Sequence, residues 1–142
     1  MALTLADVGA DAFLKARFND EWPASTKDLT LRLFVNDITP ADTNTASNYT
    51  EATGGGYVTK TLTCGGWTIT PANDPSDAVY TVQVFTFSGP LSTNPNIYGY
   101  YVTDGDGILQ WAERLVAAFT PVSDGDRLSI TAKFQLSKGT PT

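Results

Sequence analysis

The sequence predicts an all-β protein, an antiparallel β-sandwich of about seven strands preceded by one short N-terminal helix. Three observations lead to this prediction. Charged residues make up only 17% of the 142 residues, and glutamate occurs three times, whereas helix-rich domains carry more Glu, Lys and Arg. Threonine, which favours pleated surfaces, is abundant. Short apolar segments alternate with turns rich in Gly, Pro, Asn and Asp, a spacing typical of a sandwich.

Residues 7–19 carry the clear helical signal of the chain. Val8, Ala12 and Ala16 recur every four residues, which is the spacing of one helical face. Acidic residues lie in the first turn and basic residues toward the other end, as the helix dipole favours. A Trp-Pro pair then ends the segment. This predicts a helix of about three turns, which is marginal in water and needs a surface to pack against.

From residue 29 the pattern changes to a period of two, which predicts strands. In residues 29–36 apolar and polar residues alternate, so one face of this strand is expected to be buried. The exception is Phe34, an aromatic residue on the face that should be exposed. The further predicted strands cover residues 57–64, 67–70, 78–88, 97–103, 108–115 and 127–136.

One of these strands and one of the turns between them have informative details. Residues 78–88 carry apolar groups on both faces, which predicts a central strand covered on both sides. The Asp-Gly-Asp-Gly sequence at 104–107 predicts a hairpin, because glycine tolerates the positive φ that tight turns require. We find neither an internal repeat nor a second compact β unit in the sequence.

The composition argues against several function classes. A net charge of −6 and a pI near 4.3 argue against nucleic-acid binding, which needs a basic face. The absence of histidine removes Ser-His-Asp and Cys-His catalytic sets and histidine zinc sites. No apolar run approaches the ~18 residues of a membrane span, and the N-terminus lacks the features of a signal peptide. We therefore expect neither nucleic acid nor membrane as a partner.

Cys64 is the single cysteine of the chain, so neither an intrachain disulfide nor a thiolate metal cluster can form. The residues beside it include no basic group that would make the thiol reactive. We interpret Cys64 as a small buried hydrophobic residue. No cofactor is predicted.

Two carboxylate constellations could carry chemistry, and each has a plainer alternative. Asp104 and Asp106 could bind calcium, but the EF-hand template fails here, and a hairpin tip is the alternative. Glu113 with one of these aspartates could form the acid–base pair of a glycoside hydrolase. The alternative is a salt bridge from Glu113 to Arg32 or Arg114, or a hydrogen-bonded carboxylate at a strand end. We favour the plainer interpretations and predict that the protein is not an enzyme.

A third constellation is aromatic. Tyr98, Tyr100 and Tyr101, with Trp67 and Trp111, could form a stacking platform for sugars. Trp111, however, shares the parity of neighbouring leucines that are expected in the core. Aromatic clusters at strand spacing more often belong to a core or an interface, which is the interpretation we favour.

Three blocks of sequence occur in an order that we also find in a known group of proteins. They are LRLFVNDITP with YTEAT and GY (31–57), YGYYVTD with LQWAER (98–114), and GDRLSI (125–130). Asp7-Val8-Gly9 at the start of a short helix is similar as well. Together they resemble small structural proteins that are encoded in the virion-gene region of tailed bacteriophages.

The resemblance implies a structural virion protein and no enzymatic activity. The most specific expectation is a capsid decoration or cement protein that binds neighbouring capsid subunits and forms a homo-oligomer, with a trimer favoured by closed symmetry. The alternatives are a tail- or neck-associated virion protein and a glycan-binding module on an appendage. The expected location is the virion, assembled in the cytoplasm of the host bacterium.

A docking role suggests a division of the chain into an N-terminal helix and arm, residues 1–28, and a β-sandwich domain, residues 29–142. We expect the arm to be weakly held in the isolated protein and to become ordered on the particle or in the oligomer. The alternative is that the helix caps one open end of its own sandwich. The candidate interface residues are Phe13, Leu14, Phe18 and Trp22 of the arm, with Phe34 on the receiving surface.

Overall fold

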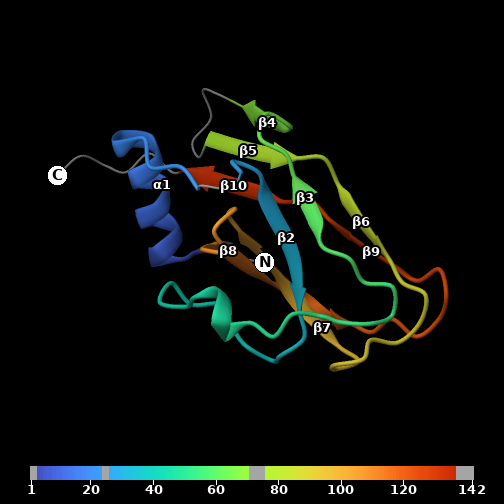
Figure 1. Cartoon of the computed structure of the whole chain (residues 1–142). Coiled ribbons are helices and arrows are strands. Elements are labelled where there is room, and N and C mark those ends of the chain that lie inside the picture. The colour runs from blue at the N-terminus through green and yellow to red at the C-terminus, as the bar shows by residue number, and fades with distance from the viewer. Residues whose placement is uncertain (1–2, 24–25, 71–75, 137–142) are drawn as a thin grey trace.

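The computed structural model describes residues 3–23, 26–70 and 76–136. Within these residues the protein is mostly β, with one N-terminal α-helix and antiparallel sheets of five, three and two strands (Figure 1). The predicted all-β, antiparallel character with a single helix at the front is confirmed. The strands of the described ranges do not close into a barrel.

The five-stranded sheet has the order β1-β8-β7-β2-β3, and every neighbouring pair is antiparallel. Its strand β7 has the predicted bounds, whereas β8 continues to Phe119, four residues beyond its predicted end. The edge strand β1 was not predicted, because three residues are too few to show a period. The strands are β1 (Leu3–Leu5), β2 (Leu29–Phe34), β3 (Lys60–Leu62), β7 (Ile97–Thr103) and β8 (Leu109–Phe119).

The remaining strands form a three-stranded sheet, β10-β5-β4, and a two-stranded sheet, β6-β9. The predicted single strands at 78–88 and 127–136 are wrong, since the chain leaves one small sheet and enters the other in both places. Alternating hydrophobicity continues across each break because it records burial and not the hydrogen-bonding partner. The strands are β4 (Trp67–Thr70), β5 (Ser76–Tyr80), β6 (Gln83–Thr86), β9 (Arg127–Ile130) and β10 (Lys133–Leu136).

The main hydrophobic core lies between the five-stranded sheet and the two smaller sheets. Leu31, Leu33 and Val102 from the large sheet pack in one cluster with Phe85 and Ile130 from the small two-stranded sheet. Because residues from both sides contribute fully buried side chains, burial of this cluster supplies the main stabilisation of the fold.

A second buried cluster covers the other face of the five-stranded sheet. The segment after β2, with the short 3₁₀ helix η1 (Ala46–Asn48), folds back over this face. Phe34 is 0% exposed, with its ring centroid 5.0 Å from that of Tyr49, which in turn stacks on Tyr101 at 5.1 Å. The expectation that Phe34 is exposed and receives a neighbouring subunit is therefore wrong. Strand alternation assigns two faces but does not show that a loop covers the second one.

Helix α1 (Asp7–Asn19) has the predicted bounds and ends at Asp20, which adopts a left-handed conformation with φ 58°. It packs against β8, and β1 pairs with the same strand, so both elements lie on the β body (Figure 1). This packing agrees with the alternative of a helix that covers its own β body. The division of the chain at residue 28 stays a prediction. Within the described residues, no helix is long and apolar enough to cross a membrane.

Candidate functional site: the apolar surface of the N-terminal helix

Four large apolar side chains lie exposed together on α1 and the turn that follows it. Phe13 is 47% exposed, Leu14 53%, Phe18 77% and Trp22 45%. We call this set the helix surface. These are the four arm residues that the sequence nominates as an interface, and the structure places them on one helix and its C-terminal extension. A cluster of exposed apolar groups of this kind is typical of a contact surface.

The helix turns small residues toward the body. Gly9 and Ala16 are buried, and Gly9 contacts the backbone of Gln110 and Leu109 in β8. The amide of Ala6 also donates a hydrogen bond to the Gln110 carbonyl, at 3.1 Å. Since the helix is held by its small residues, its larger apolar side chains are left at the margin of the contact.

A cavity of about 480 Å³ lies between α1 and the β body, and its lining is almost entirely apolar. The rings of Trp67, Trp111 and Phe134 line it on the body side, with Phe13 on the helix. All three tryptophans of the chain and its single cysteine belong to this lining. The helix surface therefore continues inward as a cavity, a feature that periodicity along the chain does not reveal.

Cys64 is exposed, so the prediction of a buried cysteine is wrong. It follows β3 in a turn, where its amide donates a hydrogen bond of 2.7 Å to Asp28 Oδ1. The turn holds the backbone in place and leaves the thiol accessible at the margin of the cavity.

The tip at Asp104 is built for turn geometry. Its Oδ1 accepts hydrogen bonds from the amides of Asp106 and Ile108, at 3.0 and 2.9 Å, and its Oδ2 accepts one from the side chain of Gln110 at 3.1 Å. Within the described residues, no group of three or more Cys, Asp or Glu side chains has the arrangement of a metal site. The observed bonds agree with the hairpin-tip interpretation.

Glu113 has a different partner from the one expected. It accepts a hydrogen bond from the Tyr100 hydroxyl, and burial, aided by this bond, raises the pKa of Tyr100. Arg32 pairs with Glu51 instead, and Arg114 pairs with Asp37 at 2.5 Å. The expected salt bridge from Glu113 is therefore wrong, and the carboxylate is hydrogen-bonded instead, although within β8 and not at the end of a strand. The alternation pattern could not reveal this contact, because it depends on the register between β7 and β8.

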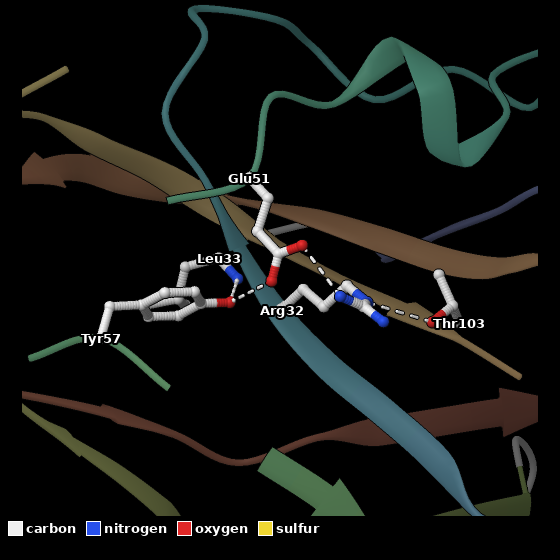
Figure 2. Close-up of polar contacts among 5 residues, drawn as sticks. All are labelled: Arg32, Leu33, Glu51, Tyr57 and Thr103. Atoms are coloured by element: carbon white, nitrogen blue, oxygen red, sulfur yellow. Dashed lines mark hydrogen bonds and ion pairs between the residues drawn. The ribbon is translucent and has the colours of Figure 1, made fainter. Parts of the chain in front are cut away.

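A polar network joins β2, β7 and the segment 51–57 (Figure 2). Arg32 forms an ion pair of 2.8 Å with Glu51 and donates a hydrogen bond of 3.3 Å to Thr103. The Tyr57 hydroxyl donates to Glu51 at 3.0 Å and accepts from the amide of Leu33 at 3.1 Å. Burial raises the pKa of Tyr57, so it remains a donor. The network connects two strands to a loop, and its polar groups form hydrogen bonds and an ion pair with one another.

The aromatic platform does not assemble. Tyr100, Tyr101 and Trp111 are buried, and they belong to two different clusters on opposite faces of the large sheet. Tyr98 and Trp67 are half-buried. The structure thus agrees with the core interpretation of these residues.

Comparison of the chain with protein-family models, with curated proteins and with solved structures finds no match in any of the three. No relative therefore assigns a role to the helix surface or to the cavity. The interpretation of both depends on the side chains that form them.

Proposed function

We propose that this protein is a structural component of a tailed-phage virion, most specifically a capsid decoration protein that binds neighbouring subunits through the helix surface. The supporting observation is the joint exposure of Phe13, Leu14, Phe18 and Trp22 beside an apolar cavity. A free surface rarely keeps large apolar side chains together, whereas a surface that is covered on assembly does. The sequence resemblance to small phage structural proteins supplies the class.

Energetics supports such attachment. Burying each of these side chains contributes roughly 1.5–3 kcal/mol, before the costs of ordering and of lost rigid-body freedom. Phe13, Leu14 and Trp22 are about half exposed, so each gains about half of that amount, and several such contacts repeated over a particle favour attachment together. The helix is already held on the body at Ala6 and Gly9, so part of the ordering cost is met in advance.

The scaffold in this proposal is a β-sandwich of about seven strands. It is supported by the core cluster that draws residues from the large sheet and from the smaller sheets. When β5 with β6 and β9 with β10 are each taken as one interrupted strand, seven strands follow residue 28. A rigid scaffold of this kind needs no cofactor to present a docking helix.

The proposed partners are capsid or other virion proteins and further copies of this chain, with a trimer favoured, and the proposed location is the virion. Closed cyclic symmetry is the usual form of such oligomers. The net charge of −6 supports this role, since it limits nonspecific adhesion to DNA during assembly. A neck or tail position uses the same surface and is an outcome of the test. Burial of Tyr100, Tyr101 and Trp111 gives no support to a glycan-binding module.

The test compares one double variant and one single variant with the unmodified full chain. Leu14→Ser with Phe18→Ser removes apolar groups from the helix surface, and Val116→Ser on β8, where Val116 is 89% exposed, is the matched control. We expect the unmodified protein and the control to form oligomers in light scattering and to sediment with phage heads, and the double variant to fail in both. A monomer that never sediments with heads overturns the proposal, and sedimentation with tails instead moves the protein to that part of the virion.

A further inference from the structure

We infer that the cavity beneath α1 binds a single alkyl chain with an anionic headgroup, a free fatty acid in chemical terms. The chain would lie against the aromatic rings on the body side, and the headgroup would lie at Lys27 on the margin. This inference goes beyond the proposed function, because it concerns a small ligand of the isolated protein. It stands on the size, the lining and the charge of the cavity.

The size and lining suit a small apolar ligand. A volume of about 480 Å³ falls within the range of about 300–1,000 Å³ that is usual for ligand sites. On the helix side the lining includes Ala10, Ala12 and Ala16, whose small side chains leave the space open. The side chains that line the cavity lack van der Waals partners on one side, and an apolar ligand would supply them.

The aromatic rings form a continuous row rather than an isolated spot. The ring centroids of Trp67 and Trp111 lie 6.1 Å apart, those of Trp111 and Phe134 5.4 Å, and those of Phe134 and Phe13 6.5 Å. The row leads from the buried core to the exposed helix. A row of rings offers successive apolar contacts to an extended chain, which is why we assign an alkyl chain and not a compact ring.

Lys27 supplies the positive charge with which an anionic headgroup would pair at the margin. Among the described residues, Lys27 is the one cation in the lining, and its ammonium lies 4.6 Å from the ring centroid of Trp22. Within the described residues it makes no ion pair. Two carboxylates lie nearby, and both are engaged. Asp28 accepts from the amide of Cys64, and Asp104 accepts from two amides and from Gln110.

The experiment uses dodecanoate below its micelle concentration, with dodecyltrimethylammonium as the charge control and butanoate as the chain-length control. Binding is followed by calorimetry and by the fluorescence of the tryptophans, all of which line the cavity. Occupancy is followed independently by protection of Cys64, the only thiol, from a maleimide reagent. Sedimentation with phosphatidylcholine–phosphatidylglycerol vesicles distinguishes a free chain from a bilayer.

Two pairs of variants locate the ligand. Lys27→Gln removes the marginal charge, and Lys60→Gln is its matched control, since Lys60 lies 5.5 Å from the ring of Phe85 at a different site. Ala12→Phe fills the cavity, and Ala117→Phe adds the same side chain at an exposed position of β8. Circular dichroism establishes that each variant is folded before binding is measured.

We expect dodecanoate to protect Cys64 and to bind more tightly than the cationic amphiphile, with no binding of butanoate. Lys27→Gln should weaken dodecanoate binding about two- to fivefold, as for an exposed ion pair, and Ala12→Phe should abolish it. Equal binding of both amphiphiles, or no protection of Cys64, overturns the inference, as does sedimentation with vesicles in place of free-chain binding. Failure here is distinguishable from failure of the proposed function, because it is read from ligand binding and Cys64 protection, whereas the proposed function is read from oligomer formation and sedimentation with phage heads.

Discussion

Gly9 of α1 lies so close to Gln110 of β8 that a Cβ atom on residue 9 would come within 2.4 Å of the Gln110 carbonyl oxygen. The contact is between backbones, so no side-chain rotation can relieve it. Together with the hydrogen bond from the Ala6 amide to the same carbonyl, this approach holds the start of the helix against β8.

Gly9→Ala should therefore destabilise the protein by about 1–3 kcal/mol, the usual cost of overpacking a close contact. The sign of this change tests the close contact, because Gly→Ala inside an unconstrained helix raises stability by roughly 0.5–1 kcal/mol. Urea denaturation measures the free energy of unfolding. Arg17→Ala, at an exposed position of the same helix, serves as the control, with an expected change within about 0.5 kcal/mol. A stabilised Gly9→Ala variant would mean that the helix does not contact β8.

Phe34→Ala should cost about 3–5 kcal/mol, because the ring is fully buried against Tyr49 beneath the loop that covers the sheet. The measurement is again the free energy of unfolding, with Val116→Ala as an exposed apolar control that stays within about 0.5 kcal/mol. If Phe34→Ala lowers the free energy of unfolding as little as Val116→Ala does, the loop does not cover this face in solution.

Glu51→Gln should weaken the polar network and lower stability by about 1–2 kcal/mol, because it leaves Arg32 half-buried without its ion-pair partner. Since both groups are about a third exposed, solvent screening keeps the effect well below that of a fully buried pair. A double-mutant cycle with Tyr57→Phe measures the coupling through the shared carboxylate. Strictly additive effects of the two substitutions would contradict the network.

Stability should fall in alkali through the buried tyrosines. Burial, aided by the negative charge of Glu51, raises the pKa of Tyr101 from 10.0 to about 12, and burial alone raises that of Tyr49 to about 12. A pKa that is higher in the folded state contributes stability that is fully present below pH 10, the unfolded value, and is lost as the pH rises to about 12.

The measurement is the urea midpoint across this pH window, beside a spectroscopic titration of phenolate. Tyr101→Phe removes one titrating group, so its midpoint should fall less steeply than that of the unmodified protein. A single titration step near the value of free tyrosine, with no loss of stability, would show that these rings are exposed.

The Cys64 thiol should react with Ellman's reagent in the folded protein, in a one-to-one ratio and without denaturant, because the side chain is exposed. Cys64→Ser should change stability by less than about 0.5 kcal/mol, as is usual for surface positions. If the thiol reacts only after unfolding, the Cys64 side chain is buried in solution, as the sequence predicted.

The sequence alone determined the elements whose signal is local. The helix at 7–19 and the strands at 67–70 and 97–103 have the predicted bounds. Their periodicity, charges and turn residues lie within a few positions of one another, so these signals can be recognised without knowing what the segment packs against. The antiparallel all-β character follows in the same way from many short strands with turns between them.

Only the tertiary structure decided what each face and each polar group meets. Phe34 is buried because a loop from residue 36 onward covers its face, and Glu113 bonds to Tyr100 because the register of β7 and β8 brings them together. The cavity is lined by α1 on one side and by residues of several strands on the other. These contacts join residues that are far apart in the chain, and a periodic pattern carries no information about such distances.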